Sequence, residues 1–291
     1  MNQQGNSTEA KSRQVDPAVL PDNGSTTLSL LLENLQDPDP RVRILAIRDI
    51  SDCGDGIVVE RLMDLAQHDP DLAVRCTAIS GLGYFIYMGG ISAYDPETDQ
   101  EAVGPDECLP KEDFEGVYGF LLSVYQDERR SLDEKCRAVE AQSYFSNDTV
   151  EDLIAELYAR PEKSAKRSAL VAMGRNGSTR WVDILRKELY SPDRDLQLEA
   201  IDAAGETSLD SLGKDLWRLT YSEDRDVMLA ALWSLGQTGW DGAFERLDEL
   251  TLHEDPGIRE ASDEAMDEWL FYNGLGSEYY EDESDESLDD E

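Results

Sequence analysis

Histidine is the side chain most often used for metal binding and for proton transfer near neutral pH, and the chain contains only His68 and His253. Each stands just ahead of a predicted helix, and the two are separated by about six lengths of the repeat described below. Two imidazoles so far apart along an elongated array cannot share a metal ion. We therefore interpret both as exposed turn residues.

Carboxylates are the second possible source of metal chemistry. One stretch between predicted helices carries acids at positions 1, 3, 5 and 12 of a calcium-binding loop, namely Asp95, Glu97, Asp99 and Asp106. Gln100 stands where that loop needs a glycine for its sharp turn, and Pro96 falls between two of the ligand positions. The calcium candidate is therefore weak, and we expect no metal and no other cofactor.

Nucleophilic and nucleotide-binding patterns are equally scarce. The sequence contains no G-x-x-x-x-G-K-[ST], G-x-G-x-x-G or G-x-S-x-G string. Its cysteines are Cys53, Cys76, Cys108 and Cys136, without C-x-x-C spacing, which is typical of a reduced cytosolic protein. Cys76 and Cys136 occupy the same repeat position, and we interpret them as packing thiols. These observations predict a protein without catalytic residues.

The strongest pattern in the sequence is a repeat of 31 residues. A small residue within an apolar patch returns at this spacing from Ala169 to Ser262, and the same frame extends towards the N-terminus. A fixed period with apolar residues at helical spacing indicates stacked helix pairs, in which each unit packs only on its neighbours. The anchor residues of the seven units are Ala46, Ala78, Ala138, Ala169, Ala200, Ala231 and Ser262.

The turns that precede the anchor helices carry a second signature. The segments DPDPRVRILAI (residues 37–47), DPDLAVRCTAI (69–79), SPDRDLQLEAI (191–201) and DPGIREA (255–261) resemble HEAT repeats, including the subgroup found in phycobilisome lyase-like proteins. The resemblance implies an all-α fold, an α-α superhelix of the HEAT or armadillo type with about seven helix pairs. It implies no single function, because many unrelated activities share this repeat.

Aspartates seven residues before the anchors are predicted helix caps. They are Asp39, Asp71, Asp193, Asp224 and Asp255. A carboxylate at this position accepts hydrogen bonds from the free N–H groups of the first helical turn and meets the positive end of the helix dipole. Arg43, Arg75 and Arg259 stand three residues before an anchor. We expect each to pair with an aspartate of its own or the adjacent unit.

Composition divides the chain into an array with two polar ends. Residues 1–25 lack the apolar core of a signal peptide and are expected to form a disordered arm. Residues 26–270 form the predicted array, interrupted by an insertion loop at about residues 88–114, whose flanking aromatic residues form either an enlarged core or a ligand cleft. Residues 271–291 end with nine acids among fourteen residues and are expected to form a disordered acidic tail.

The formal net charge is −38, from 64 acidic and 26 basic residues. Such a field repels phosphate, so we expect no nucleic-acid partner and favour basic protein segments. A second explanation stays open, in which the excess of Asp over Glu and of Arg over Lys reflects adaptation to high salt. No apolar run reaches the length of a membrane-spanning helix. We expect a monomeric cytoplasmic protein with no membrane partner.

Surface positions on the anchor helices provide the candidate binding residues. If each anchor points inward, the positions two and six residues after it lie on the opposite face of the helix. By resemblance, that face lines the concave side of a HEAT array. The candidate partner-binding residues at these positions are Tyr84, Glu140, Tyr144, Asp202, Glu206, Trp233 and Glu264. An indole among carboxylates suits a Lys/Arg-rich peptide; the alternative is that Trp233 is buried against the next unit.

The sequence thus predicts a non-catalytic interaction scaffold or regulator with an acidic concave groove for a basic protein segment. The alternative is an enzyme or enzyme accessory factor of the HEAT-like lyase kind. HEAT-like deoxyhypusine hydroxylases bind iron through several His-Glu pairs, and this chain has only His253-Glu254, so that activity is not expected. A deep pocket near Tyr84 and Tyr144 with convergent polar groups favours an enzyme, whereas an open shallow groove favours the scaffold.

Overall fold

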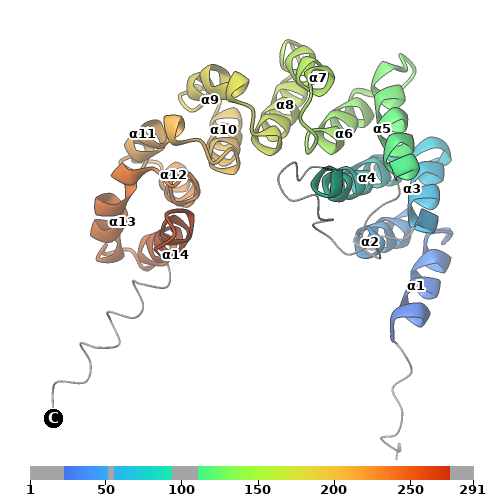
Figure 1. Ribbon diagram of the computed structural model, residues 1–291, viewed down its shortest axis with the longest axis horizontal. Coiled ribbons are helices and arrows are strands. Elements are labelled where there is room, and N and C mark those ends of the chain that lie inside the picture. Colours follow the sequence, from blue (N-terminus) through green and yellow to red (C-terminus); the bar gives the residue numbers. More distant parts are fainter. Residues whose placement is uncertain (1–22, 52–55, 94–110, 276–291) are drawn as a thin grey trace, which may run out of the picture.

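The computed structural model describes residues 23–51, 56–93 and 111–275. Within these ranges the chain forms fourteen α-helices and two short 3-10 helices, and no β-strand. Figure 1 shows the helices arranged as an arch, with the odd-numbered helices on its outer side and the even-numbered helices on its inner side. Each outer helix and the inner helix that follows it form one unit. The predicted all-α superhelix of about seven helix pairs is therefore confirmed.

All seven anchor residues lie on the inner helices. The outer helices are α1 (Asn23–Asn34), α3 (Gly56–His68), α5 (Lys111–Gln126), α7 (Asp148–Tyr158), α9 (Val182–Glu188), α11 (Asp210–Leu219) and α13 (Phe244–Thr251). The inner helices are α2 (Pro40–Ile50), α4 (Leu72–Ala93), α6 (Leu132–Gln142), α8 (Lys163–Asn176), α10 (Arg194–Glu206), α12 (Arg225–Gln237) and α14 (Pro256–Tyr272). The 3-10 helices η1 (Thr179–Trp181) and η2 (Asp241–Ala243) directly precede α9 and α13.

The predicted aspartate caps are present at the starts of the inner helices. Asp39, Asp193, Asp224 and Asp255 have extended backbones and accept hydrogen bonds from N–H groups of the first turn. Asp71 accepts from the backbone nitrogens of Ala73 and Val74, at 2.8 and 3.1 Å. The cap of α6 is different: Ser131 and Glu134 bond reciprocally to each other's backbone N–H, which is a capping box.

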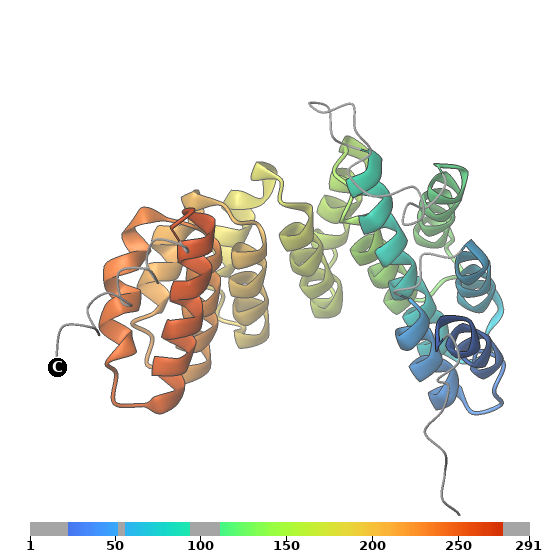
Figure 2. The same ribbon diagram turned by 60° about the horizontal axis from the view of Figure 1, so that its bottom comes forward.

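Successive inner helices pack closely because small residues face one another. The anchors themselves are at most 2% exposed. Five residues after an anchor, a glycine faces the next inner helix: a Cβ built on Gly205 would lie 2.8 Å from the Cα of Ser234, and one built on Gly236 would lie 2.3 Å from the carbonyl oxygen of Ala265. No side chain fits at these distances unless the neighbouring backbone moves. The glycines therefore set the spacing of the helices that build the concave face (Figure 2).

Ion pairs connect each unit to the next along the edge that carries the caps. In the C-terminal half, the basic residue six positions before one anchor pairs with the capping aspartate of the following unit. These pairs are Lys163 with Asp193 at 2.6 Å, Arg194 with Asp224 at 2.8 Å and Arg225 with Asp255 at 3.0 Å. The recurrence of basic residues at this position is visible in the sequence, but the sequence analysis did not identify it.

Of the three arginines that stand three residues before an anchor, Arg43 pairs with an aspartate as predicted, whereas Arg75 pairs with a glutamate. Arg43 pairs with Asp69 at 2.8 Å, and both side chains are at most 10% exposed. Arg75 pairs with Glu134 of the next unit, also at 2.8 Å. All three arginines donate to the backbone carbonyls six and five residues earlier in the chain. Arg259 differs because, within the described residues, it forms no ion pair with an acid. It belongs to the last inner helix described, so no following unit offers it an acid.

The predicted insertion loop at about residues 88–114 is helical at both ends. Helix α4 continues through Gly89 and Gly90 to Ala93, and α5 begins at Lys111. A glycine inside a helix costs only about 1 kcal/mol relative to alanine, which a long packed helix tolerates. The calcium candidates Asp95, Glu97, Asp99 and Asp106 lie outside the described residues. Residues 1–22 and 276–291, which contain most of the predicted arm and tail, also lie outside them.

Candidate functional site

The inner helices form the concave side of the arch (Figures 1 and 2). They carry the predicted binding residues, except that Tyr144 lies in the turn after α6. Trp233 on α12 is 40% exposed, so the alternative in which it is buried against the next unit does not hold. On either side of α12, Asp202 and Glu206 of α10 and Glu264 of α14 are exposed. We call these four residues the acidic region. It spans three neighbouring inner helices.

Two exposed acids, Asp202 and Glu206, stand one helical turn apart on α10. Among the described residues, Asp202 and Glu206 have no ion-pair or hydrogen-bond partner at their carboxylates. Surrounding protein atoms partly desolvate Asp202, and the charge of Glu199 adds to this effect, so its pKa is raised. Partial desolvation also raises the pKa of Glu206, although the more distant Arg175 opposes the shift. A cation placed beside them would lower both pKa values.

The N-terminal half of the concave side has a different chemistry. A recess of about 420 Å³ lies over α4, α6 and α8. Its walls come from these inner helices, from Ser51 at the end of α2 and from Tyr144 in the turn after α6. We call it the tyrosine–arginine recess. Its lining residues are Ser51, Ser80, Gly81, Tyr84, Tyr87, Arg137, Glu140, Ala141, Tyr144 and Arg175. The predicted aromatic residues Tyr84 and Tyr144 therefore share one site, as the cleft alternative required.

Ring and guanidinium contacts organise this recess. The guanidinium of Arg175 lies 5.0 Å from the ring centroid of Tyr144, and Tyr87 meets the same ring edge-on at 5.4 Å. One guanidinium nitrogen of Arg175 donates to the backbone carbonyl of Glu140 at 3.3 Å. Tyr87 and Tyr144 are 45% and 37% exposed, so part of each ring faces solvent. The contacts hold Tyr144 in place while leaving ring surface available.

Glu140 differs from its predicted role as a surface contact. It is only 4% exposed, because its carboxylate turns inward beneath Arg137, which forms a short ion pair with it. Burial raises the pKa of Glu140, although the charges of Arg137 and Arg175 and a hydrogen bond from Ser168 oppose the shift. The residue therefore forms the floor of the recess and is not available to a protein partner.

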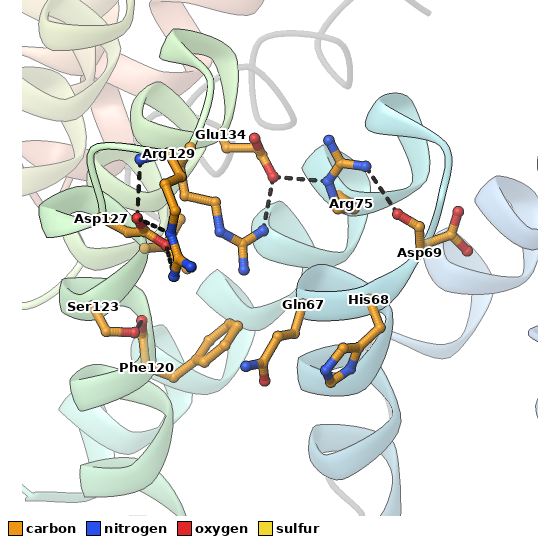
Figure 3. Close-up of a pocket in the computed structure, with 11 residues that line it drawn as sticks. Gln67, His68, Asp69, Arg75, Phe120, Ser123, Asp127, Arg129 and Glu134 are labelled. Atoms are coloured by element: carbon orange, nitrogen blue, oxygen red, sulfur yellow. Dashed lines mark hydrogen bonds and ion pairs between the residues drawn. The ribbon is translucent and has the colours of Figure 1, made fainter.

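A second hollow, of about 730 Å³, lies at the edge of the array where turns connect the outer and inner helices (Figure 3). The carboxylate of Glu134 lies between Arg75 and Arg130 and accepts from each at 2.8 Å. Burial alone would raise the pKa of Glu134, but hydrogen bonds from these arginines and from Ser131 lower it to about 2. Arg130 also donates to the carbonyl of Ala66 at 2.9 Å. The charges in this hollow thus neutralise one another and join α3, α4 and α6.

Comparison with known proteins gives the same architecture. The family described as HEAT repeats matches residues 28–98. The complex of CpcE and CpcF of phycocyanin lyase from Nostoc sp. PCC7120 is similar at a TM-score of 0.54 and 15% identity, over 91% of this chain and 99% of that chain. The array of helix pairs has the HEAT-repeat fold. At this identity, the similarity to the lyase shows the fold alone. No curated protein matches the sequence.

Other HEAT-type structures are similar at lower scores. Importin beta matches at a TM-score of 0.49 and 12% identity, over 84% of this chain and 36% of that chain. Human deoxyhypusine hydroxylase matches at a TM-score of 0.36 and 13% identity, over 83% of this chain and 84% of that chain. Within the described residues, no three His, Cys, Asp or Glu side chains are grouped so that they could hold a metal ion. No helix among those residues has the length and apolar character needed to cross a bilayer.

Some site residues of these HEAT repeats were not identified from the sequence. Arg137 stands one residue before an anchor and Tyr87 nine residues after one, outside the two positions used for prediction. Arg175 stands six residues after an anchor, where the spacing predicts exposure, but its stacking on Tyr144 depends on the neighbouring unit. The two histidines lie apart, as predicted: His68 ends α3, and His253 accepts a hydrogen bond from the backbone nitrogen of Asp255 at 3.0 Å.

Proposed function

We propose that this HEAT-repeat protein is a non-catalytic scaffold that acts as a cytoplasmic monomer and binds a basic segment of a partner protein. The acidic region, formed by Asp202, Glu206, Trp233 and Glu264, is the proposed contact surface. HEAT repeats and their solenoid relatives are consistent with an interaction scaffold in general. The choice of a basic partner depends on the charge and exposure of these four side chains.

The observation that carries the proposal is an exposed tryptophan between unpaired carboxylates. Trp233 is 40% exposed on the inner helix α12. Within the described part of the chain neither Asp202 nor Glu206 forms an ion pair, although the charge of Arg175 acts on Glu206 from beyond ion-pair distance. A lysine or arginine over an indole face gains roughly 0.5 to 2 kcal/mol. Two or three such contacts, together with charge pairing, give a specific site without any deep pocket.

The proposal predicts that single substitutions in the acidic region weaken binding of a defined basic peptide. The probe is a fluorescein-labelled Lys/Arg-rich peptide, and its anisotropy is measured at low and at physiological salt. We expect Trp233→Ala and Asp202→Lys each to raise the Kd by about tenfold with helix content unchanged. Binding should weaken as salt rises, because the contacts are partly exposed.

A matched control separates local contacts from the overall charge. Asp183→Lys makes the same charge change on the outer helix α9, at a side chain that is 96% exposed. We expect it to change the Kd less than twofold, since charges more than about 8 Å from the peptide are screened at physiological salt. Equal weakening by Asp183→Lys and Asp202→Lys would mean that the peptide senses only net charge. Unchanged binding in Trp233→Ala and Asp202→Lys would remove the acidic region as the site.

A second candidate is supported by the tyrosine–arginine recess. A recess near Tyr84 and Tyr144 with convergent polar groups is the feature that the enzyme or accessory-factor alternative requires. We place this candidate second because the cations of the recess, Arg137 and Arg175, are suited to holding an anion. Among the described residues, no hydroxyl that lines the recess is hydrogen-bonded to a side-chain base, and Ser51 donates to the backbone carbonyl of Ile47. Turnover would need a nucleophile paired with such a base.

A further inference from the structure

We propose that the tyrosine–arginine recess binds a small molecule that combines a planar ring with a carboxylate or phosphate group. This inference does not depend on the proposed function. It concerns α4, α6 and α8, whereas the acidic region lies on α10, α12 and α14. Its volume of about 420 Å³ falls within the range of small-molecule sites, which is roughly 300 to 1,000 Å³.

The first argument is a guanidinium without a carboxylate partner. In the described residues, most arginines are paired with an acid, as expected for a chain with 64 acidic and 26 basic residues. Arg175 is different: its contacts are the ring of Tyr144 and a backbone carbonyl, and Glu206 influences it only from beyond ion-pair distance. A guanidinium has five N–H donors in a planar fork that matches carboxylate and phosphate oxygens, so Arg175 retains donors for a ligand.

The second argument is the arrangement of the rings. Three tyrosines line one recess, Tyr84 and Tyr87 from α4 and Tyr144 from the turn after α6. Tyr87 and Tyr144 are packed edge to face with part of each ring exposed. Exposed aromatic surface beside a cation is costly to leave in water and suits a flat ligand. Ser51 and Ser80 add hydroxyl groups to the same wall. The recess therefore offers stacking and anion contacts within one small space.

The third argument is the buried acid beneath the arginines. Glu140 lines the recess and forms an ion pair with Arg137. Its carboxylate therefore neutralises part of the positive charge that Arg137 would otherwise present to the ligand. A glutamine at this position keeps the shape of the side chain and removes its charge. An anionic ligand should then bind more tightly. A purely structural role of Arg137 and Glu140 predicts no such gain.

The test uses four defined probes and the full-length chain at physiological salt, which screens the overall negative charge. The probes 1-naphthyl phosphate and 1-naphthylacetate carry a ring and an anion; 1-naphthol carries only the ring, and inorganic phosphate only the anion. Binding is measured by calorimetry and by the fluorescence of the naphthyl group. We expect at least one anionic naphthyl probe to bind about tenfold more tightly than 1-naphthol and than inorganic phosphate, and the better of the two identifies the anion.

Three substitutions examine the assignment of residues. Arg175→Met should weaken the anionic naphthyl probe by about tenfold, with 1-naphthol little affected. Glu140→Gln should tighten the same probe severalfold. Arg180→Met is the matched control, because Arg180 also lies over an aromatic ring, that of Trp181 at 5.2 Å, but pairs with Glu151 and Asp152 outside the recess. It should leave probe binding unchanged.

The outcomes decide the proposal in either direction. It is overturned if no probe binds, if 1-naphthol binds as tightly as the anionic probes, or if Arg175→Met and Arg180→Met behave alike. Should Arg175→Met lose helix content, the comparison of Glu140→Gln with the unmodified chain decides, and no gain in affinity overturns the proposal. Asp202→Lys is expected to leave naphthyl binding intact, so failure here and failure of the basic-peptide proposal are distinguishable.

Discussion

Replacing Glu134 by glutamine tests whether its buried carboxylate connects the units that precede and follow the insertion in the sequence. The side chain is 3% exposed and accepts from Arg75, which lies 59 residues earlier in the sequence, and from Arg130. The hydrogen bonds lower the pKa of Glu134 from 4.5 to about 2. A lowering of that size corresponds to roughly 3 kcal/mol of folding free energy at neutral pH. Breaking a buried ion pair typically costs about the same amount, 3–5 kcal/mol.

The sign of the pH dependence follows from the direction of this shift. Because the folded-state pKa is lowered, the stabilisation by Glu134 is complete above the unfolded value of 4.5 and is lost as the pH falls towards 2. The stability difference between the unmodified chain and Glu134→Gln should therefore be about 3 kcal/mol at pH 7. At about pH 3 it should be less than half of that.

Urea unfolding followed by circular dichroism at both pH values measures these differences. Asp183→Asn is the control, because Asp183 is 96% exposed in its pair with Arg186 and such surface pairs contribute at most about 1 kcal/mol. Amide hydrogen exchange in α4 and α6 should increase in Glu134→Gln before it increases in α12. A loss below about 1 kcal/mol at pH 7, or an equal loss at both pH values, would refute the bridging role.

Two further predictions concern the spacing and the connection of the units. Gly205→Ala should lower the unfolding free energy by about 1–3 kcal/mol, because the new Cβ would lie 2.8 Å from the Cα of Ser234. The control Gly119→Ala, in open space within α5, should instead raise the unfolding free energy by up to about 1 kcal/mol. Urea midpoints that shift in the same direction in both variants would contradict the role of Gly205 in helix packing. In an NMR titration, the carboxyl of Asp224 should have a pKa of about 2, because Arg194 donates hydrogen bonds to it. Arg194→Gln should return the pKa of Asp224 towards 3.8. The same pKa of Asp224 in the variant and in the unmodified chain would contradict the ion pair.

Most of the fold could be predicted because its signals are local and repeated. The buried anchors and the aspartate caps each depend on residues within one or two helical turns, and seven anchors and five aspartate caps reinforce the repeat pattern. The extension of α4 to Ala93 could not be predicted in this way. Glycines and prolines in the insertion are typical of loops, and a helix that is already packed tolerates the two glycines at little cost.

The candidate site could be predicted only as far as single-helix geometry reaches. Positions two and six after the anchor correctly place Trp233, Asp202 and Tyr144 on the exposed face. The same rule fails for Glu140, whose burial depends on Arg137 within α6 and on the approach of α8. The recess itself is built by residues of four successive units. No period within one helix specifies which side chains of neighbouring units converge.

Recognition of a basic partner and adaptation to high salt are the two explanations of the net charge, and they predict different environments for individual acidic residues. Carboxylates that serve only to keep a protein hydrated at high salt belong on fully solvated surface, where their pKa values need no shift. Many other acids lie on exposed surface or serve as helix caps. Asp202 and Glu206 do not match the environment expected for salt adaptation, because partial desolvation raises the pKa of both. Partial desolvation of an unpaired carboxylate lowers the stability of the folded protein. A cation bound beside the carboxylate would offset this loss of stability. We infer that the acids of α10 are placed for recognition, even if the rest of the charge has another origin.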